Sequence, residues 1–303
     1  MQKILLASTA LVATAGVAAA DVALSGDARV GVVYIDGAAD ETFVTNRFTL
    51  NIDASAVADN GLEMGARVRI RQDTAGELPT ITTFDEAVGD QTRVNDGING
   101  ARIYMRAGGL EFAAGNIYGA MDSLAGLYAG SIGLTGLGWG NVVTNFASHG
   151  YSSQNLGAGP EGVEATYTIG SVGLHASHAA DRTELAATFK AGAYTIGAAI
   201  ADQDDTDGQT DWLLTAGGNL GNFGVGLALA DIDGNMNATL SGSFAVGAAT
   251  TVVAYVAKDE GQAEETAYGL GVVHNMGGGV ELKGGVVDLH GQTRADLGIN
   301  FKF

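Results

Sequence analysis

Polar and apolar residues alternate with a period of two along most of this chain, and the pattern is cleanest over residues 294–303. Leu297, Ile299, Phe301 and Phe303 share one face there, and polar side chains occupy much of the other. Successive side chains of a strand point to opposite faces, so the pattern predicts a strand between two different surroundings. An apolar terminal strand in water invites aggregation, whereas a closed barrel in a membrane both pairs and covers it.

Sixteen such segments follow one another, bounded mainly by Gly, Asp and Asn. They begin near Val22, Thr42, Leu62, Ala101, Leu110, Val163, Gly173, Thr183, Ala193, Thr210, Gly221, Met236, Ala248, Glu264, Val280 and Thr293. Short, nearly uncharged connections alternate with longer or more acidic ones, as expected if one side of a bilayer carries turns and the other carries loops. We therefore predict an all-β fold, a 16-stranded antiparallel transmembrane β-barrel with both ends on the turn side. From Gly173 onward, small residues leave the facing of the strands ambiguous.

Aromatic residues gather toward the two ends of the predicted strands, where membrane barrels carry aromatic girdles. A general preference of aromatic residues for strands would explain their presence but not this clustering. On the turn side lie Phe112, Tyr167, Phe189, Tyr194, Phe223, Phe244, Phe301 and Phe303. On the loop side lie Tyr34, Phe43, Tyr118, Trp212, Tyr255 and Tyr268.

The first twenty residues have the order of a secretory signal peptide. A basic start at Lys3 is followed by an apolar stretch, 4–17, and by three alanines, 18–20. We predict cleavage before Asp21, which leaves residues 21–303 as the barrel domain. A retained helical anchor is the other interpretation, but the apolar stretch is short, and no later segment reaches the length of about 20 apolar residues that a spanning helix requires.

Composition agrees with a barrel of many strands and tight turns. The chain has 47 Gly, only 2 Pro and 46% hydrophobic residues, so few positions interrupt hydrogen-bonded strands. Cysteine is absent, so the fold uses no disulfide. A net charge of −19 makes a nucleic-acid partner an unfavourable interpretation.

Basic residues concentrate in the predicted second to fourth strands, which carry Arg47, Arg67, Arg69, Arg71, Arg102 and Arg106. In 62–71, Glu63 and three arginines occupy the odd positions, and the even positions are apolar or small. A charge facing hydrocarbon near the bilayer midplane costs about 2–4 kcal/mol, so we expect these arginines to face the lumen. The stripe is then either a solvated inner wall or one half of a transverse field across a pore.

Three segments resemble the general porins of photosynthetic and marine alphaproteobacteria, the Rhodobacter type: Ser25–Tyr34, Asn60–Gly65 and Ala295–Phe303. The resemblance implies a sixteen-stranded outer-membrane barrel, usually a homotrimer, whose third loop folds inward to form the constriction. It also implies that the terminal Phe303 is similar to the signal read by the outer-membrane assembly machinery.

The connection of about 119–162 is far too long for a simple loop and is rich in Gly and small residues, which suits a segment packed inside a barrel. Between Tyr118 and Pro160 its only carboxylate is Asp122, where members of the family usually carry several. Other candidates for charge opposing the arginines are Glu63, Asp27, Asp53, Glu111 and Glu161.

We therefore expect a Gram-negative outer-membrane channel for passive diffusion of ions and small hydrophilic solutes, in contact with membrane lipid and lipopolysaccharide. The net acidity favours a mild cation preference, although the arginines favour anions locally. Two other classes stay open: a non-conducting structural or adhesive barrel plugged by the long loop, and an outer-membrane barrel enzyme.

Metal and catalytic signals are weak. Asp202, Asp204, Asp205 and Asp207 form an acidic cluster that could hold Ca²⁺, but their spacing departs from the EF-hand loop, and a solvated loop is the simpler interpretation. His175 and His178 are three apart, which places them on opposite faces of a strand. No Walker loop and no G-x-S-x-G motif occur, so we predict no cofactor and no enzymatic activity.

Overall fold

The computed structural model describes residues 20–73, 97–128, 131–137, 161–179, 182–203 and 210–303. None of these residues belongs to a helix long and apolar enough to cross a membrane. The strands are β1 Asp21–Ile35, β2 Thr42–Val57, β3 Glu63–Asp73, β4 Gly97–Ile98, β5 Arg102–Ala107, β6 Leu110–Asn116, β7 Glu161–Ile169, β8 Val172–Ala179, β9 Arg182–Ala191, β10 Tyr194–Gln203, β11 Thr210–Leu220, β12 Phe223–Ile232, β13 Asn235–Val246, β14 Thr250–Asp259, β15 Thr266–Gly277, β16 Val280–Leu289 and β17 Gln292–Lys302.

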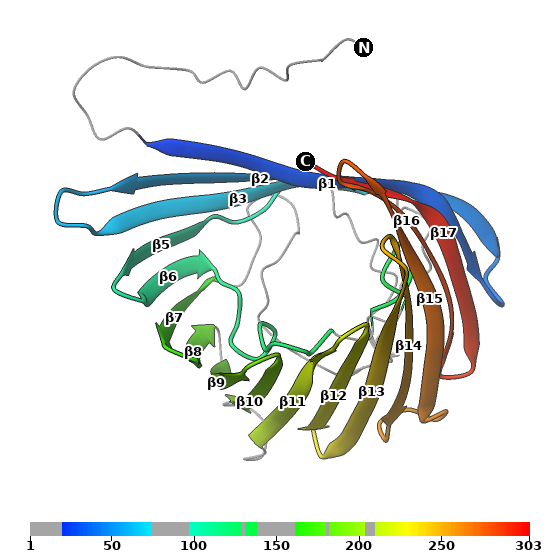
Figure 1. Cartoon of the computed structure of the whole chain (residues 1–303). Coiled ribbons are helices and arrows are strands. Elements are labelled where there is room, and N and C mark those ends of the chain that lie inside the picture. Colours follow the sequence, from blue (N-terminus) through cyan, green and yellow to red (C-terminus); the bar gives the residue numbers. More distant parts are fainter. Residues whose placement is uncertain (1–19, 74–96, 129–130, 138–160, 180–181, 204–209) are drawn as a thin grey trace, which may run out of the picture.

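All strands form one antiparallel sheet that closes on itself (Figure 1). β1 pairs with β17 over the register from Asp27↔Lys302 to Ile35↔Arg294, and the backbone of Gly26 exchanges hydrogen bonds of 2.9 and 3.0 Å with that of Phe303. β4 and β5 both pair with β3, so they are two parts of one barrel strand. The predicted closed barrel of sixteen antiparallel strands is confirmed.

Each predicted strand start lies within two residues of an observed one. Among the strands of the described residues, the sequence pattern missed the short β4 alone. The break after β4 is held by side-chain amides that replace sheet hydrogen bonds: Asn99 Oδ1 accepts from the backbone N–H of Arg69 at 2.7 Å, and Asn116 Nδ2 donates to the carbonyl of Gly100 at 3.1 Å. Such local irregularity has no signal in a period-two pattern.

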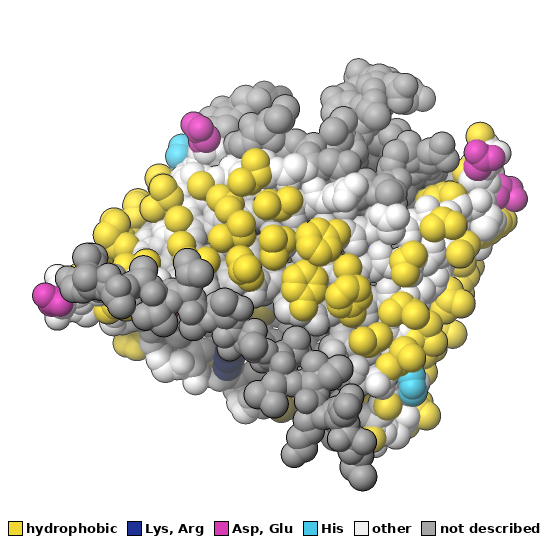
Figure 2. Space-filling model, turned by 90° about the horizontal axis from the view of Figure 1, so that it is seen from above, with side chains coloured by type: hydrophobic (Ala, Val, Ile, Leu, Met, Phe, Trp, Pro, Cys, Tyr) yellow, Lys and Arg dark blue, Asp and Glu magenta, His cyan; other side chains and the backbone are white. Residues whose placement is uncertain are grey.

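The outer face of the barrel is apolar. Large hydrophobic side chains at alternate positions are exposed all around the barrel, such as Val44, Ile103, Leu227 and Val256. Figure 2 shows one face of the barrel, where hydrophobic side chains cover the middle and acidic residues lie toward the edges. A water-soluble protein would bury such side chains, and a bilayer covers them.

Three of the expected girdle residues lie on the inner face of the barrel instead. Tyr255 is buried against Val287 on the inner wall, and Tyr118 forms a hydrogen bond with Arg67 in the lumen. Phe43 is the register partner of the buried Val33 and shares the inward parity of Arg47. Position along the chain predicts the end of a strand at which a residue lies, but not its face. The prediction that these three residues belong to a membrane girdle is therefore wrong.

Candidate functional site

The predicted arginine stripe lies on the lumen face of neighbouring strands. Arg67 of β3 stands opposite Asp53 of β2 and opposite Arg102 of β5, and Arg69 stands opposite Asn51. Residues of alternate parity, such as Met64 and Ile103, are exposed on the outer surface. Strand parity therefore places all six arginines on the inner wall: Arg47, Arg67, Arg69, Arg71, Arg102 and Arg106.

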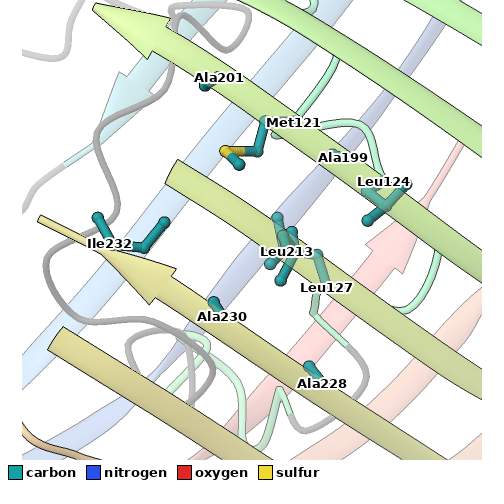
Figure 3. Packing of buried hydrophobic residues seen from close by; sticks show 9 residues of the cluster. All are labelled: Met121, Leu124, Leu127, Ala199, Ala201, Leu213, Ala228, Ala230 and Ile232. Atoms are coloured by element: carbon teal, nitrogen blue, oxygen red, sulfur yellow. The ribbon is translucent and has the colours of Figure 1, made fainter. Parts of the chain in front are cut away.

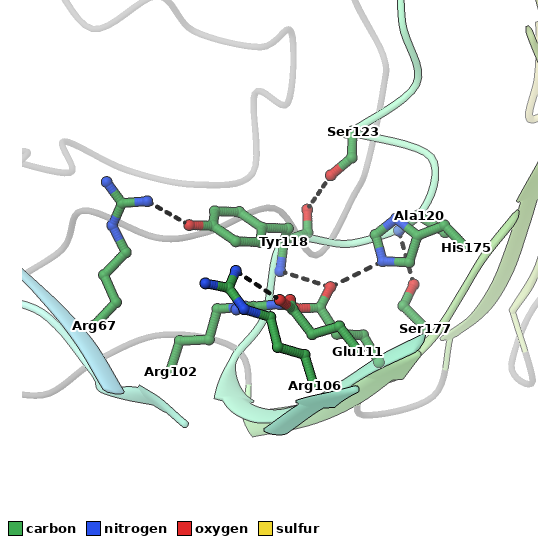
Figure 4. Close-up of polar contacts among 10 residues, drawn as sticks. Arg67, Arg102, Arg106, Glu111, Tyr118, Ala120, Ser123, His175 and Ser177 are labelled. Atoms are coloured by element: carbon green, nitrogen blue, oxygen red, sulfur yellow. Dashed lines mark hydrogen bonds and ion pairs between the residues drawn. The ribbon is translucent and has the colours of Figure 1, made fainter. Parts of the chain in front are cut away.

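Tyr118, which follows β6, joins two of these arginines (Figure 4). Its hydroxyl interacts with Arg67 Nη1 at 2.7 Å, and the guanidinium carbon of Arg102 lies 4.5 Å from the centre of its ring. Its backbone N–H donates to Glu164 Oε2 at 3.2 Å. Tyr118 thus fixes the start of the lumen loop against the arginine-bearing strands, through a hydrogen bond and a cation–π contact.

Arg102 is the buried centre of an ion-pair network. Its guanidinium lies 2.6 Å from Glu111 and 2.6 Å from Glu164, while Glu164 also contacts His175 Nε2 at 2.9 Å. The side chains of Arg102 and Glu164 are only 5% and 1% exposed, so their charges are shielded from the water of the lumen. Arg106, half exposed, forms a bidentate pair with Glu63 at 2.6 and 2.9 Å. Charge-assisted bidentate pairs of this kind fix both side chains in place.

The carboxylates that meet the arginines therefore come mostly from the same wall. Of the candidates, Glu63 pairs with Arg106, Glu111 pairs with Arg102, and Asp53 lies 3.5 Å from Arg67. Glu164 was not among the candidates, although its lumen-facing position in β7 was a signal that could have identified it. The structure brings Glu63 together with the arginines, as expected for a lumen-facing residue.

Asp122, the loop acid expected to oppose the arginines, has a different neighbour. Within the described residues its carboxylate accepts a hydrogen bond from the hydroxyl of Tyr128, six residues further along the same loop. Burial raises the pKa of Asp122, and the hydrogen bond from Tyr128 offsets this only in part. Asp122 is therefore held by a contact within the loop, and the charge of Glu184 on β9 acts on it as well.

The loop from residue 119 covers an apolar part of the inner wall. Met121, Leu124 and Leu127 are buried against small and aliphatic side chains of three neighbouring strands (Figure 3). The wall residues of this cluster are Ala199 and Ala201 of β10, Leu213 of β11, and Ala228, Ala230 and Ile232 of β12. Burial of these side chains removes apolar surface from water and holds the loop inside the barrel.

Polar wall residues bind the backbone of the same loop. The N–H of Ala120 donates to Ser177 Oγ at 2.9 Å, and the N–H of Met121 donates to Glu184 Oε2 at 2.9 Å. The hydroxyl of Thr215 donates to the carbonyl of Ala125 at 2.6 Å. A loop inside a membrane barrel must satisfy its backbone groups, and these contacts do so along residues 120–125.

A second buried ion-pair network supports these contacts. Arg182 lies 3.1 Å from Glu184 and 2.9 Å from Asp211, and all three side chains are almost fully buried. Sequence reasoning missed this network because Arg182 and Asp211 lie next to predicted loops. Arg182 and Glu184 of β9 and Asp211 of β11 all point into the lumen. The strand positions of these three charges could have predicted that they meet.

The predicted calcium cluster is described only in part. Asp202 lies exposed at the end of β10, whereas Asp204, Asp205 and Asp207 lie outside the described residues. Among described residues, no group of three or more His, Cys, Asp or Glu side chains could hold a metal ion. The predicted leader, 1–20, lies almost wholly outside the described part of the chain, as does part of the loop 119–162.

Known proteins share this architecture. A family model described as Gram-negative porin matches residues 7–294. A porin of Fuscovulum blasticum is 27% identical over 309 residues, which cover 93% of this chain and all of that protein. A porin of Rhodobacter capsulatus is 28% identical over 325 residues, with the same coverage. The solved structure of a mutant of Rh. blastica porin matches with a TM-score of 0.78 at 26% identity and covers 93% of this chain and all of that one.

Proposed function

Because this chain belongs to the Gram-negative porin family, we propose that its arginine-bearing wall and its lumen loop together form the constriction of an outer-membrane channel. The protein is a multi-pass outer-membrane porin, a channel and not an enzyme. The contact of Arg67 on β3 with Tyr118 at the start of the loop is the observation that carries the proposal. It supports a passage bounded by arginines on one side and by the loop on the other.

Solutes would cross this passage by diffusion through water, selected by its width and by the charge of its lining. Guanidinium groups stay protonated at any physiological pH, so the arginines act as fixed positive charges. Arg102 and Arg106 are paired with wall carboxylates, which weakens the field that they project into the lumen. With a net charge of −19 for the whole chain, we infer a mild preference for cations.

Ion selectivity in planar bilayers tests the proposed constriction. We compare the wild-type channel with a variant carrying Arg67→Gln, Arg69→Gln and Arg71→Gln. Two charges 4 Å apart interact by about 1 kcal/mol in water, so we expect the permeability ratio of cations over anions to rise by about fivefold. Reversal potentials in a salt gradient measure that ratio.

The matched control removes three positive charges from exposed sites at strand ends: Lys190→Gln, Lys258→Gln and Lys302→Gln. If the arginines form the constriction, the control leaves the ratio close to the wild-type value. Equal shifts in both triple variants would show that only net charge matters, and the proposed role of the arginines would be rejected. A wild-type protein that produces no stepwise current would contradict the channel itself.

We further propose that the barrel assembles as a homotrimer in contact with lipopolysaccharide, after export by a cleaved leader, 1–20. Family membership and the apolar outer face support these proposals. Phe303 would present the terminal strand to the assembly machinery. The absence of a cofactor stays a prediction, with Ca²⁺ held by Asp202, Asp204, Asp205 and Asp207 as its alternative.

A further inference from the structure

A second part of the lumen loop, after the residues that contact β10–β12, lies on the inner wall where the last strands meet the first. This docking segment, Ile132–Thr135, contacts β15, β16, β17 and β1 through side chains and backbone. Ile132 is 2% exposed and packs in a cluster with Tyr255 and Val287 of the wall. The segment lies against glycines of these strands.

Two pairs of glycines face each other across strands beneath the docking segment. Gly271 of β15 is the register partner of Gly285 of β16, and a Cβ added to either would overlap Cγ2 of Ile132. Gly31 of β1 is the register partner of Gly298 of β17. A Cβ on Gly298 would come within 2.5 Å of Leu134 Cδ2, and one on Gly31 would overlap the same atom. Each pair therefore leaves a recess that holds one loop side chain.

Glycine inside a strand has a cost, because it orders a flexible backbone and provides no side chain for packing. A pair of glycines in register doubles that cost at one place in the sheet. Close approach of another part of the chain is the usual reason for such a glycine, and here the approaching part is the loop. By contrast, the nearest atom to a Cβ added to Gly242 of β13 would be a backbone oxygen at 3.8 Å.

Polar contacts between the two recesses set the direction of the docking segment. Asp296 of β17 accepts hydrogen bonds from the N–H of Leu134 at 2.9 Å and from both the N–H and the hydroxyl of Thr135 at 2.7 Å. Arg29 Nη1 donates to the carbonyl of Leu134 at 3.1 Å. Gly133 has a φ of +77° and lies so close to the Asp296 carboxylate that a Cβ there would overlap it. Backbone and side chains are thus fixed together.

We propose that the two glycine pairs are positions that determine the bore, because they set how closely the lumen loop lies against the wall. The inference rests on the proposed channel function, since a loop displaced from the wall would move into the water-filled passage. A methyl group on Gly285 would have to reach a normal carbon–carbon separation of about 3.5 Å, which moves the loop by about 1 Å. In a narrow passage, a shift of that size changes both conductance and the largest solute admitted.

Gly285→Ala gives the cleanest test, because the three atoms nearest to the added Cβ all belong to Ile132 and Gly133 of the loop. We expect its single-channel conductance to fall by about one third, with exclusion of smaller polyethylene glycols than the wild type excludes. The control Gly242→Ala makes the same chemical change in β13, where space is available, and should conduct like the wild type. Heat-modifiable gel mobility checks barrel closure in every variant.

Two further variants that change Ile132 distinguish displacement of the loop from damage to the barrel. Ile132→Ala combined with Gly285→Ala removes the overlap and should restore wild-type conductance. Ile132→Phe enlarges the loop side chain without altering any strand, and should lower conductance even if Gly285→Ala fails to fold. The inference is overturned if Ile132→Phe conducts like Gly242→Ala, or if the double variant stays as low as Gly285→Ala. Absence of current from the wild type would instead contradict the proposed channel.

Discussion

Single side chains on the inner wall hold the lumen loop by more than one kind of contact. The hydroxyl oxygen of Tyr118 accepts a hydrogen bond from Arg67, its ring contacts the guanidinium of Arg102, and its backbone N–H donates to Glu164. Glu164 also bonds His175, so this buried carboxylate joins β5, β8 and the loop. Removing one partner of a buried charge pair leaves the other charge uncompensated, which is strongly destabilising. The loop start therefore depends on residues that do not line the passage themselves.

The raised pKa of Asp122 leads to a prediction of how the ion selectivity of the channel changes with pH. Its pKa is raised by burial, so as the pH falls it binds a proton above the ordinary aspartate value of about 3.9. At neutral pH the wild type carries one more negative charge in the loop than Asp122→Asn, and we expect the stronger cation preference in the wild type. As the pH falls through the raised pKa, the two channels should converge. Reversal potentials between pH 7 and acidic pH measure the difference.

Asp59→Asn is the matched control for this prediction, because Asp59 lies exposed in the turn between β2 and β3. It removes an equal charge outside the lumen and should follow the wild-type pH profile. A constant gap between wild type and Asp122→Asn down to the pH at which an ordinary aspartate titrates would contradict the raised pKa. No gap at neutral pH would show that the Asp122 charge does not reach the passage.

Residue-scale sequence reasoning identified the face of the arginines but not their partners. Parity fixes the face of Arg67 or Arg102 because strand side chains alternate strictly. The partner of Arg102 depends on which strands become neighbours, and Glu164 lies 62 residues further along the chain. Asp122 was expected to face the arginines because it was the only acid in its segment. The hydrogen bond from Tyr128 to Asp122 depends on the fold of the loop, which a count of its acidic residues does not specify.

At the scale of elements, the strands after Gly173 have ambiguous alternation for a physical reason. The inner faces of β10–β12 carry Ala199, Leu213 and Ile232, which the loop covers, while their outer faces meet lipid. Both faces are therefore apolar or small, and a period-two pattern cannot distinguish them. In β3, where the inner face meets water and charge, the alternation is clear. The strand starts were predictable in both regions because turn residues mark them.

The contacts of Phe303 at the end of the terminal strand predict the effect of its deletion. The N–H of Phe303 donates to the carbonyl of Gly26 at 3.0 Å, and its carbonyl accepts from the N–H of Gly26 at 2.9 Å. Its ring stacks on Phe48 with centroids 5.8 Å apart. Deletion removes two hydrogen bonds, each of about 1 kcal/mol net, together with the ring contact at the closing strand pair. We expect a several-fold lower yield of folded barrel in outer membranes, with normal conductance in the molecules that fold.

Phe301→Ala is the control for this deletion, because it removes a neighbouring ring while keeping the backbone contacts of the last residue. Its yield should exceed that of the deletion variant. Folded yield is measured from the fraction with heat-modifiable mobility, and conductance from single channels. Wild-type yield without Phe303 would mean that neither closure nor assembly depends on the last residue.

The barrel as a whole has an outer surface adapted to hydrocarbon. The cost in stability of placing a charge on this surface should therefore depend on the depth of the residue in the bilayer. Leu227 lies in the middle of β12 and points outward, so Leu227→Arg should destabilise the barrel by about 2–4 kcal/mol. Val246, at the turn-side end of β13, is also exposed, and Val246→Arg should cost about 0–1 kcal/mol. Urea unfolding in lipid vesicles measures both. Equal costs would show that the two sites do not differ in depth.

Barrel closure also determines when the passage acquires its final width. Leu134 lies over a recess made by Gly31 of β1 and Gly298 of β17, and the same loop segment is bonded by Arg29 of β1 and Asp296 of β17. Neither recess wall alone can hold it, so this docking place does not exist until the first and last strands have met. An incompletely closed barrel therefore cannot have a correctly sized constriction, and the finished pore is a late product of folding.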